Sequence, residues 1–144
     1  MSILKVLNSG SKGNCYLLIT PNETLIIEAG IRYKDILKGL DFKLDKVVGC
    51  LVSHEHKDHS KSIEDLIKNG IDIYSSKGTF KALGIENYRS KVIKANKKQQ
   101  IGNFTILPFD VVHDAEEPLG FLIKHQDIGC LLYTSPSPRD GLLS

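Results

Sequence analysis

Three of the five histidines of this 144-residue chain lie within six residues, in the segment VSHEHKDHS (residues 52–60). His54 and His56 are separated by one residue, and Asp58 and His59 follow directly. In an extended segment, residues two apart point the same way, so His54 and His56 can bind one ion together. Neutral imidazole suits zinc, and a zinc site with three protein ligands keeps a position open for water. The segment therefore predicts a metal site that activates water.

Two other interpretations of the cluster compete with a metal site. The HExxH helix of zinc proteases would need a histidine four residues after His54, where this chain has Asp58. A polar surface turn with coincidental histidines is the remaining alternative, and the crowding of His54, His56 and His59 argues against it.

Two further histidines lie outside the cluster. His113 ends a strand-like run in FDVVHDAEEPLGF and has a second strand-like run directly behind it, which makes it the natural third imidazole of the site. His125 has no such context, and we expect it to face solvent.

The elements that must position these side chains alternate between strands and helices. The segment KVVGCLVS (residues 46–53) is nearly continuously apolar, as expected of a strand covered on both faces, and it leads directly into the histidine cluster. Apolar residues at near-helical spacing predict helices in residues 31–40 and 60–70. The pattern predicts a mixed α/β (α+β layered) domain. Further strands are expected at 2–7, 15–20, 25–30, 71–75, 91–94, 103–109 and 119–125, and a short helix at 78–84.

Composition sets the broad class. The chain is 41% hydrophobic and 25% charged, as in soluble globular proteins. No apolar run approaches the ~20 residues that span a bilayer, and the N-terminus lacks the pattern of a secretory signal, so we expect a cytoplasmic protein with no membrane contact. The three cysteines indicate neither a disulfide framework nor a CxxC site, and the net charge of +2 is too small to indicate a partner.

The segment HEHKDH fits HxHxDH, the signature of the metallo-β-lactamase fold superfamily. The resemblance extends over nearly all of residues 1–129, through SGSKGN, LIIEAGI and HDAEEPLGFLI in that order. The chain resembles a compact bacterial and phage branch of this superfamily that includes DNA exonucleases. The resemblance implies an αββα sandwich, of which this chain would form the N-terminal part, with mixed β-sheets flanked by helices.

The resemblance also implies roles for the site residues. His54, His56 and His113 would bind one metal ion, and Asp58 and His59 would contribute to a second. Two zinc ions, or manganese or iron, would be held in the full-length protein and one in this chain, since the bridging aspartate and last histidine of the family have no match after Gly129.

Three residues are expected to assist the site. Asp58 is the expected catalytic residue, orienting the attacking water and moving its proton. Glu28 occupies the place of an aspartate that orders the ligands in the family, and it departs from that pattern by one methylene. Asn14, in SGSKGN, would position substrate or else supply the local hydrogen bonds of a turn.

The expected function is metal-dependent hydrolysis, with a nucleic-acid phosphodiester (DNA or RNA) as the favoured substrate. The segment YRSKVIKANKK contains five basic and no acidic residues, which suits a phosphate backbone, although such a run is also typical of a solvated surface. A thioester, lactone or other small ester is the alternative substrate. A third possibility, from a different class, is that this chain is a non-catalytic fragment that binds one metal ion.

The last fifteen residues depart from the preceding pattern. The stretch CLLYTSPSPRD, from Cys130 to Asp140, resembles the translation of a transposase-type sequencing adapter over eleven consecutive residues. We therefore expect residues 1–129 to be the native N-terminal portion of a metallo-β-lactamase-like domain and residues 130–144 to be a non-native tail.

Overall fold

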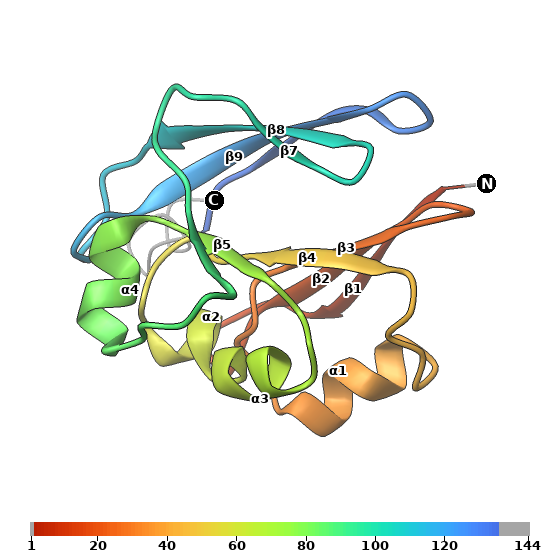
Figure 1. The fold of residues 1–144 in the computed structure, drawn as a ribbon, viewed down its shortest axis with the longest axis horizontal. Helices are drawn as coiled ribbons and strands as arrows, with labels where there is room; N and C mark the ends of the chain where they lie inside the picture. The colour runs from red at the N-terminus through yellow and green to blue at the C-terminus, as the bar shows by residue number, and fades with distance from the viewer. Residues whose placement is uncertain (1, 136–144) are drawn as a thin grey trace.

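The computed structural model describes residues 2–135 and arranges them as two facing β-sheets, with helices on the outer face of the larger sheet (Figure 1). The larger sheet has six strands in sequential order, antiparallel from β1 to β3 and parallel from β3 to β6. Its strands are β1 (Ile3–Asn8), β2 (Cys15–Ile19), β3 (Thr24–Ile27), β4 (Val47–Leu51), β5 (Ile73–Ser75) and β6 (Ser90–Val92).

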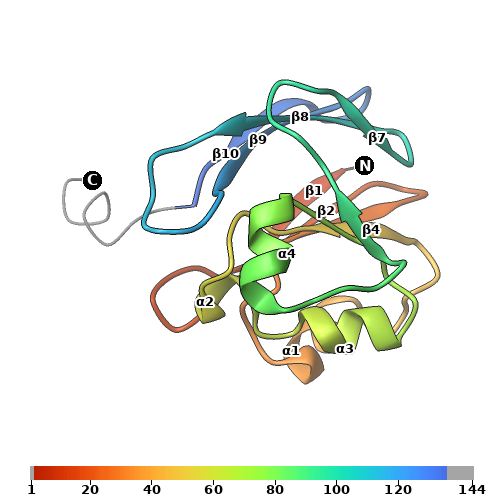
Figure 2. The same ribbon diagram turned by 60° about the vertical axis from the view of Figure 1, so that its left-hand side comes forward.

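The smaller sheet has the order β10-β9-β8-β7, and all its pairs are antiparallel. Its strands are β7 (Gln99–Ile101), β8 (Phe104–Asp110), β9 (Leu119–His125) and β10 (Gly129–Tyr133). Figure 2 shows this sheet above the larger one, with α1 and α3 below both. The helices are α1 (Tyr33–Gly39), α2 (Lys57–Ser60), α3 (Ile63–Lys68) and α4 (Lys77–Leu83). Residues 2–135 thus form one helical layer and two sheet layers, and in them no helix covers the outer face of the smaller sheet.

Two hydrophobic cores hold these layers together, one on each face of the larger sheet. Ile26 of β3 packs toward the helices, while its neighbours Leu25 and Ile27 pack against the smaller sheet. Because successive strand residues point to opposite faces, a strand between two cores is apolar at every position. This explains the apolar runs of β3 and β4, whose carboxyl ends meet at one edge of the sheet.

The structure refines several expected elements. β3 ends at Ile27, because Glu28 has a φ of +69° and leaves the strand. β7 was not predicted, since its three residues are too few to show an alternating pattern. The expectation for His125 was wrong. It is buried, its ring centroid lies 4.6 Å from that of Phe104, and its Nδ1 accepts a hydrogen bond from the Asp127 amide.

The predicted boundary between Gly129 and Cys130 falls after the first residue of β10, which pairs with β9 through Tyr133. The part of the tail beyond residue 135 lies outside the described residues. Among the helices of residues 2–135, none has the length and apolar character that crossing a bilayer requires.

Candidate metal centre

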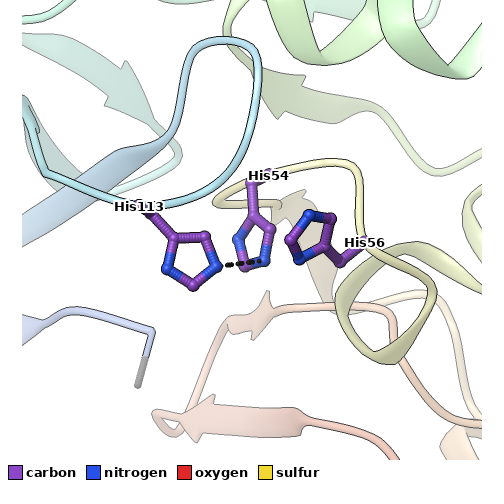
Figure 3. Close-up of side chains that lie close together, drawn as sticks. All are labelled: His54, His56 and His113. Carbon is purple, nitrogen blue, oxygen red and sulfur yellow. Dashed lines mark hydrogen bonds between the residues drawn. The ribbon is translucent and has the colours of Figure 1, made fainter. Parts of the chain in front are cut away.

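Three of the predicted ligands converge between the two sheets. His54 and His56 follow β4, and His113 comes from the loop that joins β8 to β9 (Figure 3). The Nε2 atoms of His54 and His113 lie 3.1 Å apart, and one ring nitrogen from each of the three histidines lies within 4.8 Å of the others. Two nitrogens bound to a tetrahedral zinc ion lie about 3.3 Å apart, given Zn–N bonds of about 2.0–2.1 Å. The three side chains therefore form a cluster that could bind one ion.

The hydrogen bonds of Ser53 define which nitrogen of His54 faces this cluster. The Ser53 hydroxyl donates its single hydrogen to Oε2 of Glu28 at 2.6 Å, and it lies 2.8 Å from Nδ1 of His54. Because that hydrogen is already used, Ser53 must accept from a protonated Nδ1. Nε2 of His54 then carries the lone pair and points toward His113.

The charge state of His54 also fits the role of a metal ligand. Burial lowers the pKa of His54 to about 2, and the neighbouring imidazoles of His59, His113 and His56 add to this effect. Burial likewise lowers the pKa of His113. Neutral imidazole is the form that binds metal ions, so these two side chains are in the form that a ligand requires.

Asp58 and His59 lie in the short helix α2, beside the histidine cluster. Nε2 of His59 lies 3.4 Å from Oδ2 of Asp58, and its Nδ1 donates a hydrogen bond to Oε2 of Glu28. Burial alone would lower the pKa of His59, but the hydrogen bond and charge of Glu28, with the charge of Asp58, raise it overall. His59 thus presents Nε2, next to a carboxylate oxygen, on the side away from Glu28.

Glu28 is fully buried and links the two groups of candidate ligands. Its Oε1 accepts from the Ser53 amide at 2.8 Å, and its Oε2 accepts from the Ser53 hydroxyl, from His59 and from the Tyr133 hydroxyl. Glu28, His54 and His59 also lie close enough to bind an ion together. However, both Glu28 oxygens already accept hydrogen bonds, and its carboxylate contacts His59 directly and His54 through Ser53, the arrangement expected of a group that orients metal ligands.

Asn14 lies in the loop between β1 and β2 and is 1% exposed. Its amide nitrogen donates to the carbonyl oxygens of Gly10 and Asp58, at 2.9 and 3.1 Å, and its Oδ1 accepts from the Gly10 amide. These internal bonds fit the alternative of a residue that supplies local hydrogen bonds. They connect the loop to the helix that carries Asp58 and His59.

Sequence reasoning missed two residues of the site, Ser53 and Gly30. A Cβ at Gly30 would lie 1.7 Å from the carbonyl oxygen of Asp58, so only glycine allows this approach. Ser53 is the last residue of the predicted strand 46–53, although its hydroxyl and its position directly before His54 are signals of a role in the site.

The fold of this chain is the metallo-β-lactamase fold, as predicted. Its structure matches that of the metallo-β-lactamase fold protein YhfI from Bacillus subtilis with a TM-score of 0.73 and 17% sequence identity, over 93% of this chain and 61% of that one. The chain belongs to the family described as "Anti-Pycsar protein Apyc1", which it matches over residues 8–84.

Curated relatives extend the match over most of the chain. The exodeoxyribonuclease WalJ of Streptococcus pneumoniae is 31% identical over 140 residues, and the exodeoxyribonuclease YycJ of Bacillus anthracis is 28% identical over 138. Each match covers 90% of this chain and 52% of the relative, so the chain spans about half the length of these relatives. The predicted resemblance to a branch that includes DNA exonucleases is confirmed.

Proposed function

We propose that this protein is a metal-dependent hydrolase of nucleic-acid phosphodiesters. The observation that carries the proposal is the facing pair of Nε2 atoms of His54 and His113, 3.1 Å apart, with His56 beside them. The names of the exodeoxyribonuclease relatives support the choice of substrate.

In this proposal each residue of the site has a distinct role. His54, His56 and His113 would hold one divalent ion, and Asp58 with His59 would contribute to a second. Bound ions, zinc or else manganese or iron, would lower the pKa of water toward ~7 and stabilise negative charge on the phosphoryl group. Asp58, whose side chain is 33% exposed, would orient the attacking water and accept its proton.

Hydrolysis assays on three probes test this proposal. We expect cleavage of 5′-labelled single-stranded DNA and of bis(p-nitrophenyl) phosphate, loss of both after chelation, and recovery with Zn²⁺, Mn²⁺ or Fe²⁺. Hydrolysis of a lactone or thioester without DNA cleavage would instead establish the small-ester alternative. Zinc binding without turnover of any probe would establish the non-catalytic alternative.

Basic residues beside α4 support a nucleic-acid substrate. Lys94, from the basic segment noted in the sequence, lines a hollow of about 480 Å³ together with Lys77 and Lys81 of α4. The hollow also contacts Glu116 and Glu117 of the loop that carries His113. Arg89 is less available than the sequence indicated, because its guanidinium donates to Asp72 at 2.9 Å. The lysines therefore lie where a strand could approach the candidate site.

Neutralising these lysines separates the two substrate classes. The triple variant Lys77→Gln, Lys81→Gln, Lys94→Gln is expected to weaken DNA binding and to reduce the salt dependence of binding, by about one unit of log–log slope per lysine. Hydrolysis of bis(p-nitrophenyl) phosphate should stay unchanged. Lys43→Gln, on an exposed loop after α1, is the matched control. An unchanged salt slope in the triple variant would show that DNA does not bind along this surface.

We also propose a cytoplasmic location, in keeping with a nucleic-acid substrate, and a non-native origin for residues 130–144. Sequencing the locus from an independent library tests the second proposal. A reading frame that departs from the present sequence after Gly129 would support it, and an identical sequence would refute it.

A further inference from the structure

The loop between β8 and β9 brings His113 to the site from the smaller sheet, and its anchors lie on segments that follow β4 and β5 of the larger sheet. The Glu116 amide donates to Oε2 of Glu55 at 3.0 Å, and Glu55 stands between the ligands His54 and His56. At the end of the loop, the Leu119 amide donates to the Ser53 carbonyl at 2.9 Å. These two hydrogen bonds therefore connect the loop to the segment that carries His54 and His56.

A second anchor lies at the first turn of α4. Oε1 of Glu117 accepts from the Gly78 amide at 2.8 Å, and the Ser76 hydroxyl donates to the Glu117 carbonyl at 2.7 Å. The approach is close, since a Cβ added at Gly78 would lie 2.6 Å from Cβ of Glu117. The backbone at Gly78 would accept alanine in a helix, so the absence of a side chain there serves the contact with the loop.

These anchors matter because little else holds His113. Its neighbour Val112 is 101% exposed, so the loop is not packed against a core at that point. The eight residues from Val111 to Pro118 form neither helix nor strand. An imidazole on such a segment needs fixed points on both sides to keep its Nε2 near that of His54.

We propose that Glu55 and Glu117 are positioning residues that hold His113 in place as the third imidazole of the site. Glu55 acts next to His54 and His56, and Glu117 acts through the first turn of α4. The three histidines of the proposed site would thus come from segments connected to both sheets. The proposal rests on the proposed function, because it takes the three histidines as a metal site.

Variants of Glu55 can separate the effect of its hydrogen bond to the loop from the effect of its negative charge. Its Oε2 holds the loop, while Oε1 is buried and has no hydrogen-bond partner among the described residues. Glutamine at this position keeps an acceptor for the Glu116 amide and removes the charge. Alanine removes both.

The experiment uses the full chain in two states. In the metal-free protein, amide hydrogen exchange at Glu116 and the NMR signals of the His113 ring report on the loop. In zinc titrations, the dissociation constant reports on the site. Glu55→Ala is expected to accelerate exchange at Glu116 about tenfold and to weaken zinc binding about tenfold to a hundredfold. Glu55→Gln should restore slow exchange and most of the affinity.

Two further variants test the second anchor. Glu117→Ala and Gly78→Ala are both expected to shift the His113 ring signals and to weaken zinc binding. Gly78→Ala should do so although it changes neither a candidate ligand nor a side chain that forms a hydrogen bond. Glu116→Ala is the matched control, because it removes a carboxylate from the same loop and keeps the backbone amide that Glu55 binds. It should behave as the wild type in both states.

The outcomes distinguish this proposal from the proposed function. Wild-type exchange, ring signals and zinc affinity in Glu55→Ala and Glu117→Ala would overturn the positioning role, whatever the protein hydrolyses. Altered exchange and affinity in a protein that binds zinc and cleaves no DNA would support the positioning role and overturn the nuclease. The metal-free measurements decide the question for the loop even if zinc does not bind.

Discussion

Replacing His54 with alanine is expected to abolish tight zinc binding by this chain. His54 is fully buried at the centre of the cluster, with its ring centroid 4.6 Å from that of His56 and 4.2 Å from that of His113. Structural zinc sites bind with about 10–16 kcal/mol, so one ligand among three or four contributes about 3–4 kcal/mol, or a hundredfold to a thousandfold in affinity. Calorimetric zinc titration measures this loss.

The controls for that titration lie within the same chain. His125→Gln changes the one histidine of the chain that is not a candidate metal ligand, and it should keep the wild-type affinity. The wild-type stoichiometry is informative in addition. A value near two would exclude the one-metal fragment, whereas a value near one fits three imidazoles alone. Unchanged affinity in His54→Ala would show that the metal site has been assigned to the wrong residues.

Replacing Glu28 with alanine is expected to lower both the stability of the chain and its zinc affinity. Glu28→Ala leaves the Ser53 amide, the Ser53 hydroxyl and Nδ1 of His59 without their acceptor inside the protein. Breaking a buried charged network by removing one partner costs about 3–5 kcal/mol, so the free energy of unfolding should fall by that amount. Zinc affinity should fall as well, because His54 and His59 lose the group that fixes their protonated nitrogen.

Urea denaturation of the metal-free chain measures the first effect, and zinc titration measures the second. Glu28→Asp keeps both acceptor oxygens on a side chain one methylene shorter, so its stability and its zinc affinity should be intermediate. Glu86→Ala, an exposed carboxylate after α4, should change stability by less than about 0.5 kcal/mol. Full stability and full zinc affinity in Glu28→Ala would contradict the orienting role.

The sequence predicted the part of the site that is local along the chain. His54, His56, Asp58 and His59 are consecutive or nearly so, and the apolar run before them indicated a strand that would carry them to the edge of the sheet. The layered α/β fold followed from the alternation of strand-like and helical segments. His113 was predicted because the site lacked a third imidazole and because the family has one in that context.

The parts of the fold and of the site that the sequence did not predict depend on contacts between segments far apart along the chain. The hydrogen bond from Glu116 to Glu55 joins residues 61 positions apart, and no local pattern indicates it. β3 ends three residues before the expected point because Glu28 adopts a positive φ, a conformation that propensity disfavours and that the network around its carboxylate stabilises. His125 was misjudged because burial against Phe104 is a property of the sheet.

The close approach at Gly30 has a consequence for how such sites are recognised from sequences. The Gly30 amide donates to the Asn14 carbonyl, and the Asn14 amide donates to the Asp58 carbonyl, so three chain segments meet where a single methyl group would not fit. Gly30 carries no chemistry and would contact no ion. Even so, natural variation at this position should be as restricted as at the histidines, and a glycine after LIIEA is as informative for identifying related sites as the ligands themselves.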